Sequence, residues 1–249
     1  MSEMVVVPAE ERSFWRGDGI TTRQSFPFTG NFDLAANAHG LLLVHNDDLI
    51  DPAMGVDMHR HRNAEIVTWV VEGEISHRDS SGMRGIVRAG QVQAMSAGSG
   101  VTHAETNTAP RRGGTVARVI QMWLPPDAPG GESEYRTADV ASALDRGGLV
   151  TVASGMPGHV PAVAIRNDAA ALHAARLSAG RTVVLPEAPY GHLFVVTGTV
   201  GVSNGRAGVH ALGDGDALRT RRAGELYVTG VQDAEILYWE MHAAALTAL

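Results

Sequence analysis

The sequence predicts an all-β protein made of two tandem β domains, and three observations support this prediction. Short apolar, β-branched runs recur between turns rich in Gly, Asn and Asp. A Pro- and Gly-rich stretch divides the chain near its middle, and part of the first half is repeated in the second. With 249 residues the chain has the length of two domains of modest size.

Six runs are the clearest candidates for strands, because each is apolar, β-branched and bounded by turn residues. They are Ile66–Val71, Val116–Leu124, Thr182–Leu185, Leu193–Val196, Leu226–Val228 and Ile236–Trp239. Ser80-Ser81-Gly82 and Asn204-Gly205 have the composition of tight turns, so both predict hairpins.

Helix is expected only in one short segment. Asp168–Leu177 is rich in Ala and Leu, which lead the helix-propensity scale. Its place in the internal repeat, ahead of the strand that follows Gly180, favours a strand instead. Because propensity is a weak guide against tertiary context, we predict a strand there. Thr137–Asp145 is expected to form a short helical turn.

An internal repeat links the two halves of the chain. Val70–Ile75 matches Val195–Val200 at an offset of 125 residues (195 − 70), and Gly90 matches Gly215 at the same offset (215 − 90). Two separate anchors therefore keep one register, and this indicates a duplicated β domain.

The later part of the repeat is expected at a shorter offset. Arg118–Trp123 aligns with Ile236–Met241 at 118 residues (236 − 118), which implies a longer loop around His103 in the first half. The Pro- and Gly-rich stretch Pro125–Ser133 is the natural linker. We therefore predict a first domain over residues 1–130 and a second over residues 131–249.

Composition and charge exclude several classes of partner and site. The formal net charge of −7, from 20 basic and 27 acidic residues, gives no electrostatic basis for direct binding of nucleic acid or of an anionic membrane. A basic cluster at Arg219, Arg221 and Arg222 is typical of a solvated loop. Without cysteine there is no disulfide, thiol nucleophile or Cys-ligated metal. No leader sequence and no run of ~20 apolar residues is recognised, so we expect a soluble, cytoplasmic monomer.

Two short motifs in the first half predict a metal site. His59 and His61 are separated by one residue, and so are His103 and Glu105 about forty residues later. Alternate residues of a strand point to the same face, so two neighbouring strands can aim all four side chains at one point. Imidazole and carboxylate without thiolate suit a redox-active or borderline divalent ion with an open coordination position.

The second half lacks these ligands. At the offset of 125 residues, the positions of His59 and His61 become Val184 and Pro186. No histidine lies between His210 and His242. The sequence therefore predicts that only the first domain holds a metal.

The residues around the two motifs form a longer pattern: Asn46-Asp47-Asp48, His59-x-His61-x-x-x-Glu65-Ile66-Val67-Thr68-Trp69-Val70-Val71-Glu72-Gly73, His77-x-Asp79-Ser80-x-Gly82, Gly90-x-Val92-Gln93-x-Met95-Ser96-Ala97-Gly98-x-Gly100-x-x-His103-x-Glu105 and Gln121-x-Trp123. The spacings of the two motifs resemble the cupin superfamily, and the longer pattern resembles one branch of it, the pirin family. The resemblance covers the first half nearly throughout, whereas the second half matches only in the general shape of the domain. It implies two tandem cupin barrels (double-stranded β-helix, or jelly-roll), the first with one metal on His59, His61, His103 and Glu105 and the second without metal.

Glu65 competes with Glu105 for the place of the fourth ligand. By strand parity Glu65 faces the same side as His59 and His61, and many cupins use the glutamate at this place. Pirins use the glutamate at the place of Glu105, so we assign Glu105 to the metal and expect Glu65 to orient a ligand imidazole. The alternative for Glu65 is a surface carboxylate at a strand end. Trp69 either lines the pocket or packs in the core.

The other histidines have no partner at ligand spacing and are expected to be packing or surface residues. They are His39, His45, His77, His159, His173, His192, His210 and His242.

The resemblance implies oxygenase chemistry of the quercetin 2,3-dioxygenase type on a small aromatic, flavonol-like substrate. In this interpretation Glu105 is the catalytic residue and accepts the proton of the substrate hydroxyl. The resemblance favours iron as the metal, while nickel, copper, manganese and zinc also accept these ligands. A non-catalytic, metal-binding regulator that acts through a protein partner is the alternative. A third interpretation is an enzyme of another type, such as an isomerase, on the same scaffold.

Overall fold

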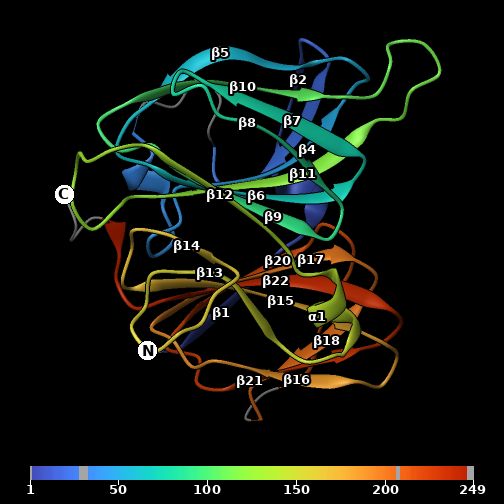
Figure 1. Cartoon of the computed structure of the whole chain (residues 1–249). Helices are drawn as coiled ribbons and strands as arrows, with labels where there is room; N and C mark the ends of the chain where they lie inside the picture. Colours follow the sequence, from blue (N-terminus) through green and yellow to red (C-terminus); the bar gives the residue numbers. More distant parts are fainter. Residues whose placement is uncertain (1, 28–32, 206–207, 246–249) are drawn as a thin grey trace.

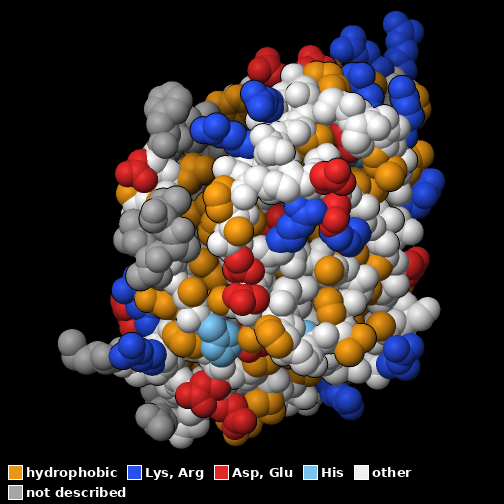
Figure 2. Space-filling model, turned by 60° about the vertical axis from the view of Figure 1, so that its left-hand side comes forward, with side chains coloured by type: hydrophobic (Ala, Val, Ile, Leu, Met, Phe, Trp, Pro, Cys, Tyr) orange, Lys and Arg blue, Asp and Glu red, His pale blue; other side chains and the backbone are white. Residues whose placement is uncertain are grey.

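Two stacked halves, each built from two β-sheets, make up the molecule (Figure 1). This computed structural model describes residues 2–27, 33–205 and 208–245. On the surface seen in Figure 2, acidic and basic side chains are interspersed with apolar ones. In the described part of the chain, no helix has the length and apolar character needed to span a membrane.

The first half contains a seven-stranded sheet and a four-stranded sheet. The larger has the order β12-β9-β6-β11-β4-β3-β2 and the smaller the order β5-β10-β7-β8. Their bounds are β2 (Ser13–Gly17), β3 (Ile20–Gln24), β4 (Val44–Ile50), β5 (Gly55–His61), β6 (Glu65–Glu72), β7 (Glu74–Asp79), β8 (Arg84–Arg88), β9 (Gln91–Ser96), β10 (Val101–Asn107), β11 (Ala117–Leu124) and β12 (Glu134–Asp139).

The second half repeats this arrangement. Its larger sheet has the order β1-β20-β17-β22-β15-β13-β14 and its smaller sheet the order β16-β21-β18-β19. The bounds are β1 (Glu3–Val7), β13 (Val150–Ser154), β14 (Val163–Ala164), β15 (Ala170–Leu177), β16 (Thr182–Leu185), β17 (Tyr190–Thr197), β18 (Val200–Ser203), β19 (His210–Leu212), β20 (Ala217–Arg221), β21 (Leu226–Gly230) and β22 (Ala234–Met241). The short helices are α1 (Ala141–Asp145) and the 3₁₀ turns η1 (Ala9–Glu11) and η2 (Ala35–Asn37).

The all-β prediction and most of the predicted elements are confirmed. Each of the six predicted runs coincides with a strand or part of one, except that Val116 precedes β11. Ser80-Ser81-Gly82 lies in the turn between β7 and β8. Asn204-Gly205 follows β18 and leads to its antiparallel partner β19, although residues 206–207 lie outside the described residues. The predicted strand at 168–177 is also confirmed, because β15 pairs with both β13 and β22.

The helix predicted over Thr137–Asp145 is wrong in its first part. Helix α1 covers only Ala141–Asp145, whereas residues 137–139 continue strand β12. Pairing with β9 explains the difference, since Thr137 is opposite Gln93 in that ladder. Tertiary pairing overrides local preference here.

The duplication is confirmed, with one correction to its register. Gly73 and Gly198 match within the segments Val70–Ile75 and Val195–Val200, and both have a left-handed backbone, with φ of 76° and 82°. In the β6–β11 ladder Leu124 is opposite Glu65, and in the β17–β22 ladder Met241 is opposite Tyr190. Glu65 and Tyr190 correspond at the offset of 125 residues (190 − 65), so their partners Leu124 and Met241 correspond as well. The later offset is therefore 117 residues (241 − 124) and not 118. A slip of one residue exchanges the two faces of a strand, so this correction decides which side chains correspond.

The two halves exchange edge strands across the predicted linker. Strand β12 follows the linker, yet it pairs with β9 in the first half. Strand β1 begins the chain, yet it pairs with β20 in the second half, where it takes the edge place that β12 takes in the first. A division at residue 130 thus separates both edge strands from their sheets. The predicted boundary between two folding units at residue 130 stays a prediction.

The largest apolar core lies between the halves. It joins Trp69 of the first half to Phe194 and Trp239 of the second, all fully buried. Trp69 Nε1 donates to Glu235 Oε1 at 2.8 Å, and Trp239 Nε1 lies 3.1 Å from Met122 Sδ. Trp69 is therefore a core residue, so its interpretation as a pocket wall is wrong. The opposite faces of the two large sheets line the separate interiors of the two barrels.

Candidate metal centre

Three of the four predicted ligands converge inside the first barrel. His59 and His61 lie on β5, and His103 lies directly opposite His59 on β10. Their ring centroids are 4.4 Å apart for His59 and His103, 4.6 Å for His59 and His61, and 4.9 Å for His61 and His103. One possible ligand atom from each ring lies within 4.8 Å of the others.

The hydrogen bonds of these rings leave nitrogens available for a cation. His59 Nδ1 lies 2.7 Å from the backbone oxygen of Asp57, which leaves Nε2 for another partner. His61 Nε2 and His103 Nε2 are buried and have no hydrogen-bond partner in the described part of the chain. Buried polar atoms are nearly always paired, so these nitrogens fit a bound metal ion.

The electrostatic environment keeps two of the imidazoles neutral. Burial, together with the neighbouring His59 and His103, lowers the pKa of His61 to about 3. Burial also lowers the pKa of His103 to about 3, with contributions from His59 and His77. Since a neutral imidazole is the metal-binding form, protons do not compete for these ligands at neutral pH.

Glu105 lies beside this triad, held by two amides. Its Oε1 accepts a hydrogen bond from Gln93 Nε2 at 2.8 Å, and its Oε2 accepts one from Gln121 Nε2 at 2.6 Å. It belongs with His77 and His103 to a second group of metal-capable residues, which does not include His59 or His61. A carboxylate has about four lone-pair sites, so these two bonds leave room for a metal.

The motif Gln121-x-Trp123 fixes one of the two amides. Trp123 Nε1 is only a donor and lies 3.1 Å from Gln121 Oε1, so the amide nitrogen of Gln121 must face Glu105. The indole of Trp123 also packs edge-on against His61, with 4.7 Å between ring centroids. On the other side, Tyr135 OH donates to Gln93 Oε1 at 3.0 Å.

Glu65 does not have the role predicted for it. Its carboxylate is 1% exposed and accepts hydrogen bonds from Ser96 Oγ at 2.7 Å and from the backbone nitrogen of Arg166 at 2.9 Å. It therefore orients no ligand imidazole, and it is not a surface carboxylate. Because Arg166 belongs to the second half, Glu65 ties the two halves together. Its partner is 101 residues away in the sequence, which explains why parity alone gave the wrong role.

The sequence interpretation missed His77. This residue is fully buried, and its Nδ1 lies 3.4 Å from His103 Nδ1. The signal for it was its spacing of two from Asp79 on one strand, inside a motif that the resemblance had already included. The other histidines listed with it are not in either group of metal-capable residues found in the described chain.

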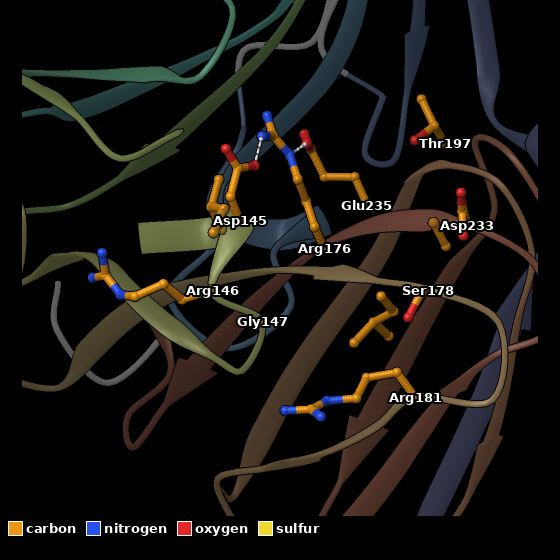
Figure 3. A pocket seen from close by; sticks show the side chains of 12 residues that line it. Asp145, Arg146, Gly147, Arg176, Ser178, Arg181, Thr197, Asp233 and Glu235 are labelled. Carbon is orange, nitrogen blue, oxygen red and sulfur yellow. Dashed lines mark hydrogen bonds and ion pairs between the residues drawn. The ribbon is translucent and has the colours of Figure 1, made fainter. Parts of the chain in front are cut away.

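Among the described residues of the second half, no comparable cluster lies at the matching place. Val184 is opposite Tyr227 there, and both are substantially exposed. A cavity of about 550 Å³ lies elsewhere in this half, next to α1 and the end of β15 (Figure 3). Its wall carries Arg176, which donates at 2.8 Å to both Asp145 and Glu235. None of the predicted site residues lines this cavity.

Comparison with known proteins places these residues in a family. The Pirin family model matches residues 8–124. A Mycobacterium tuberculosis protein named "Putative quercetin 2,3-dioxygenase Rv0181c" is 43% identical over 235 residues, which cover 94% of this chain and 93% of the relative. A "Pirin-like protein" of Caulobacter vibrioides is 34% identical over 220 residues, covering 88% of this chain and 89% of the relative.

The fold is likewise similar to that of a solved structure. The crystal structure of bacterial pirin YhhW in complex with nickel(II) from Escherichia coli matches with a TM-score of 0.83 and 26% identity, covering 97% of this chain and all of the other. The two barrels described above are thus the cupin barrels that the motifs implied. The chain belongs to the pirin family.

Proposed function

We propose that this chain is a metal-dependent oxygenase of the quercetin 2,3-dioxygenase type, with one divalent metal ion on His59, His61, His103 and Glu105. The observation that carries the proposal is the convergence of three imidazoles, of which two have buried, unpartnered Nε2 atoms. The name of the Mycobacterium tuberculosis relative supports the reaction type, and the nickel complex of YhhW supports a metal in this fold.

The residues around the centre suit a planar aromatic substrate. Trp123 packs against His61, and Val101 is opposite His61 in the ladder, so this side of the centre is apolar. His59 is half-buried, whereas His61 and His103 are buried, so a substrate would approach past His59. The metal, when bound, acidifies a coordinated substrate hydroxyl.

Glu105 would accept the proton from that hydroxyl. Its carboxylate is held by Gln93 and Gln121, so its orientation is fixed before substrate arrives. A base that is already oriented contributes typically 10²–10⁴-fold to the rate of proton transfer. The two amides thereby hold the Glu105 carboxylate in one orientation, so the substrate hydroxyl must approach it from one direction.

The identity of the metal is a separate part of the proposal. Nitrogen and oxygen ligands of this kind accept iron, nickel, copper, manganese and zinc, and metal availability often decides between them. We propose iron. Elemental analysis of protein purified without an affinity tag tests this choice. One equivalent of another metal would show that the proposal of iron is wrong.

Oxygen uptake with quercetin tests the proposed reaction. Metal-loaded protein should consume dioxygen and bleach the absorbance of quercetin, whereas metal-free protein and His61→Ala should do neither. His210→Ala, which removes a histidine of the second barrel, is the matched control and should behave as wild type. If the metal-loaded protein binds one equivalent of metal yet leaves quercetin and dioxygen unchanged, the oxygenase proposal is wrong.

A further inference from the structure

A line of hydrogen bonds runs from the metal centre into the β7–β8 hairpin. His103 Nδ1 lies 3.4 Å from His77 Nδ1, and His77 Nε2 lies 3.2 Å from Asp79 Oδ2. The strand register explains this alignment, because His103 is opposite Asp79 and Glu105 is opposite His77 on β10 and β7. The spacing His77-x-Asp79 therefore places an imidazole and a carboxylate next to the proposed ligands.

The hairpin turn fixes the far end of this line. Asp79 Oδ1 accepts hydrogen bonds from Ser81 N at 2.9 Å, Ser81 Oγ at 2.6 Å and Met83 N at 3.1 Å. Burial acts to raise the pKa of Asp79, but the hydrogen bonds from Ser81, His77 and Met83 lower it overall. The carboxylate is therefore ionised at neutral pH and accepts hydrogen bonds at both oxygens.

These groups are shielded from solvent. The side chains of His77 and Asp79 are 0% and 3% exposed. Tyr135 of β12 stacks on His77, with ring centroids 4.4 Å apart and an interplanar angle of 30°. Water therefore cannot readily replace His77 or Asp79 as a hydrogen-bond partner. The proton of each hydrogen bond in the line must lie between the two ring or carboxylate atoms given above for it.

We propose that Asp79 and His77 position His103 by fixing which of its ring nitrogens carries the proton. Asp79 only accepts, so His77 donates from Nε2 and keeps an acceptor at Nδ1. His103 then donates from Nδ1, and its unpartnered Nε2 keeps the lone pair that a metal requires. This inference rests on the proposed metal centre and not on the reaction performed there.

An isosteric substitution of Asp79 should reverse the donor and acceptor roles in both the Asp79–His77 and the His77–His103 hydrogen bonds. In Asp79→Asn, the amide oxygen must take the Oδ1 place, because the backbone N–H groups of Ser81 and Met83 point there. The amide NH₂ then faces His77, which must accept at Nε2 and carry its proton on Nδ1. His103 in turn accepts at Nδ1, and its proton moves to Nε2. An asparagine beside a histidine is known to impose the wrong tautomer in this way.

NMR of the imidazole nitrogens in metal-free protein tests this directly. With ¹⁵N-labelled histidine, the wild type should show His103 protonated on Nδ1 and His77 on Nε2, and Asp79→Asn should show both reversed. Glu240→Gln is the matched control, because Glu240 Oε2 lies 2.8 Å from His173 Nε2 at a buried place in the second half. The control should leave His77 and His103 unchanged. Wild-type tautomers in Asp79→Asn, or Nε2–H on His103 in the wild type, would overturn the proposal.

Metal titration gives a second, independent readout. Asp79→Asn should weaken metal binding by roughly 10–100-fold, as is typical when a partner of a ligand imidazole is changed. His77→Gln can still accept from His103 and donate to Asp79, so it should bind metal more tightly than His77→Phe, which can do neither. Equal affinities for His77→Gln and His77→Phe would contradict the proposal even if Asp79→Asn failed to fold. Neither the NMR measurement nor the metal titration uses quercetin, so both can still be interpreted if the oxygenase proposal is wrong.

Discussion

At the scale of single residues, strand parity carried the prediction of the metal ligands. His59 and His61 share a face of β5 because they are two residues apart, and His103 faces them from the neighbouring strand. Parity places His77 and Asp79 on one face of β7, but it could not show that His77 meets His103 across the β7–β10 ladder. Nor could it show that one partner of Glu65 is in the other half. The fourth ligand, Glu105, stays a prediction.

Gln121 should matter for metal binding although it is not a ligand. Gln121→Leu removes the donor to Glu105 Oε2 and the amide oxygen that accepts from Trp123 Nε1. We expect metal affinity to fall by roughly 10–100-fold while the fold is kept. Isothermal titration with the metal found in the native protein measures this. A variant that binds as tightly as wild type would show that the amide does not position Glu105.

At the scale of the elements, the periodic and turn signals predicted the strands well, and pairing decided the exceptions. Strand β15 has helical composition, yet it is paired along both edges, with β13 and β22. The start of the predicted helix at 137–139 is instead an edge strand on β9. The offset is 117 residues on both sides of an irregularity that the two ladders share, and sequence similarity alone aligned these strands one residue away.

Gly73 and Gly198, which correspond in the repeat, provide a matched pair for an element-scale test. Both have a left-handed backbone, which costs a residue with a Cβ about 1–2 kcal/mol. A Cβ on Gly73 would lie 3.1 Å from Ala117 Cβ, whereas one on Gly198 would collide with the backbone oxygen of Asp233. Gly198→Ala should therefore lower the free energy of unfolding more than Gly73→Ala, as measured in urea. The opposite order would mean that the turn after β17 relaxes to accept the side chain.

At the scale of the whole molecule, the two barrels share a core and exchange edge strands. Composition and the repeat predicted two β domains, but nothing local in β1 or β12 indicates that each pairs in the other half. The interface also buries His45 of β4 against His192 of β17, with ring centroids 4.5 Å apart. These imidazoles make the stability of the folded chain depend on pH.

Stability should fall as the pH drops below the ordinary pKa of histidine. Burial lowers the pKa of His39 to about 4, and it lowers the pKa values of His45 and His192 well below their usual range. The unfolded chain takes up protons below about pH 6.5 while the folded chain does not, so each group costs about 1.4 kcal/mol per pH unit down to its folded pKa. Burial raises the pKa values of Asp48, to about 7, and of Glu65, and these two groups oppose the trend.

Urea unfolding at pH 7 and pH 5 measures this effect, and a variant isolates one group. His192→Phe removes an imidazole that has no hydrogen-bond partner among the described residues. The stability of this variant should therefore fall less than that of the wild type between the two pH values. An equal or steeper fall would show that His192 does not stay neutral in the folded protein.

The central claim is that the three imidazoles of the first barrel hold one metal ion, and metal content tests it most directly. Protein purified without a tag and dialysed against trace metal should contain one equivalent per chain. His61→Ala should contain none, while its second barrel still unfolds cooperatively, because the apolar core of that barrel does not include β5. A full equivalent retained by His61→Ala would place the metal elsewhere and contradict the account.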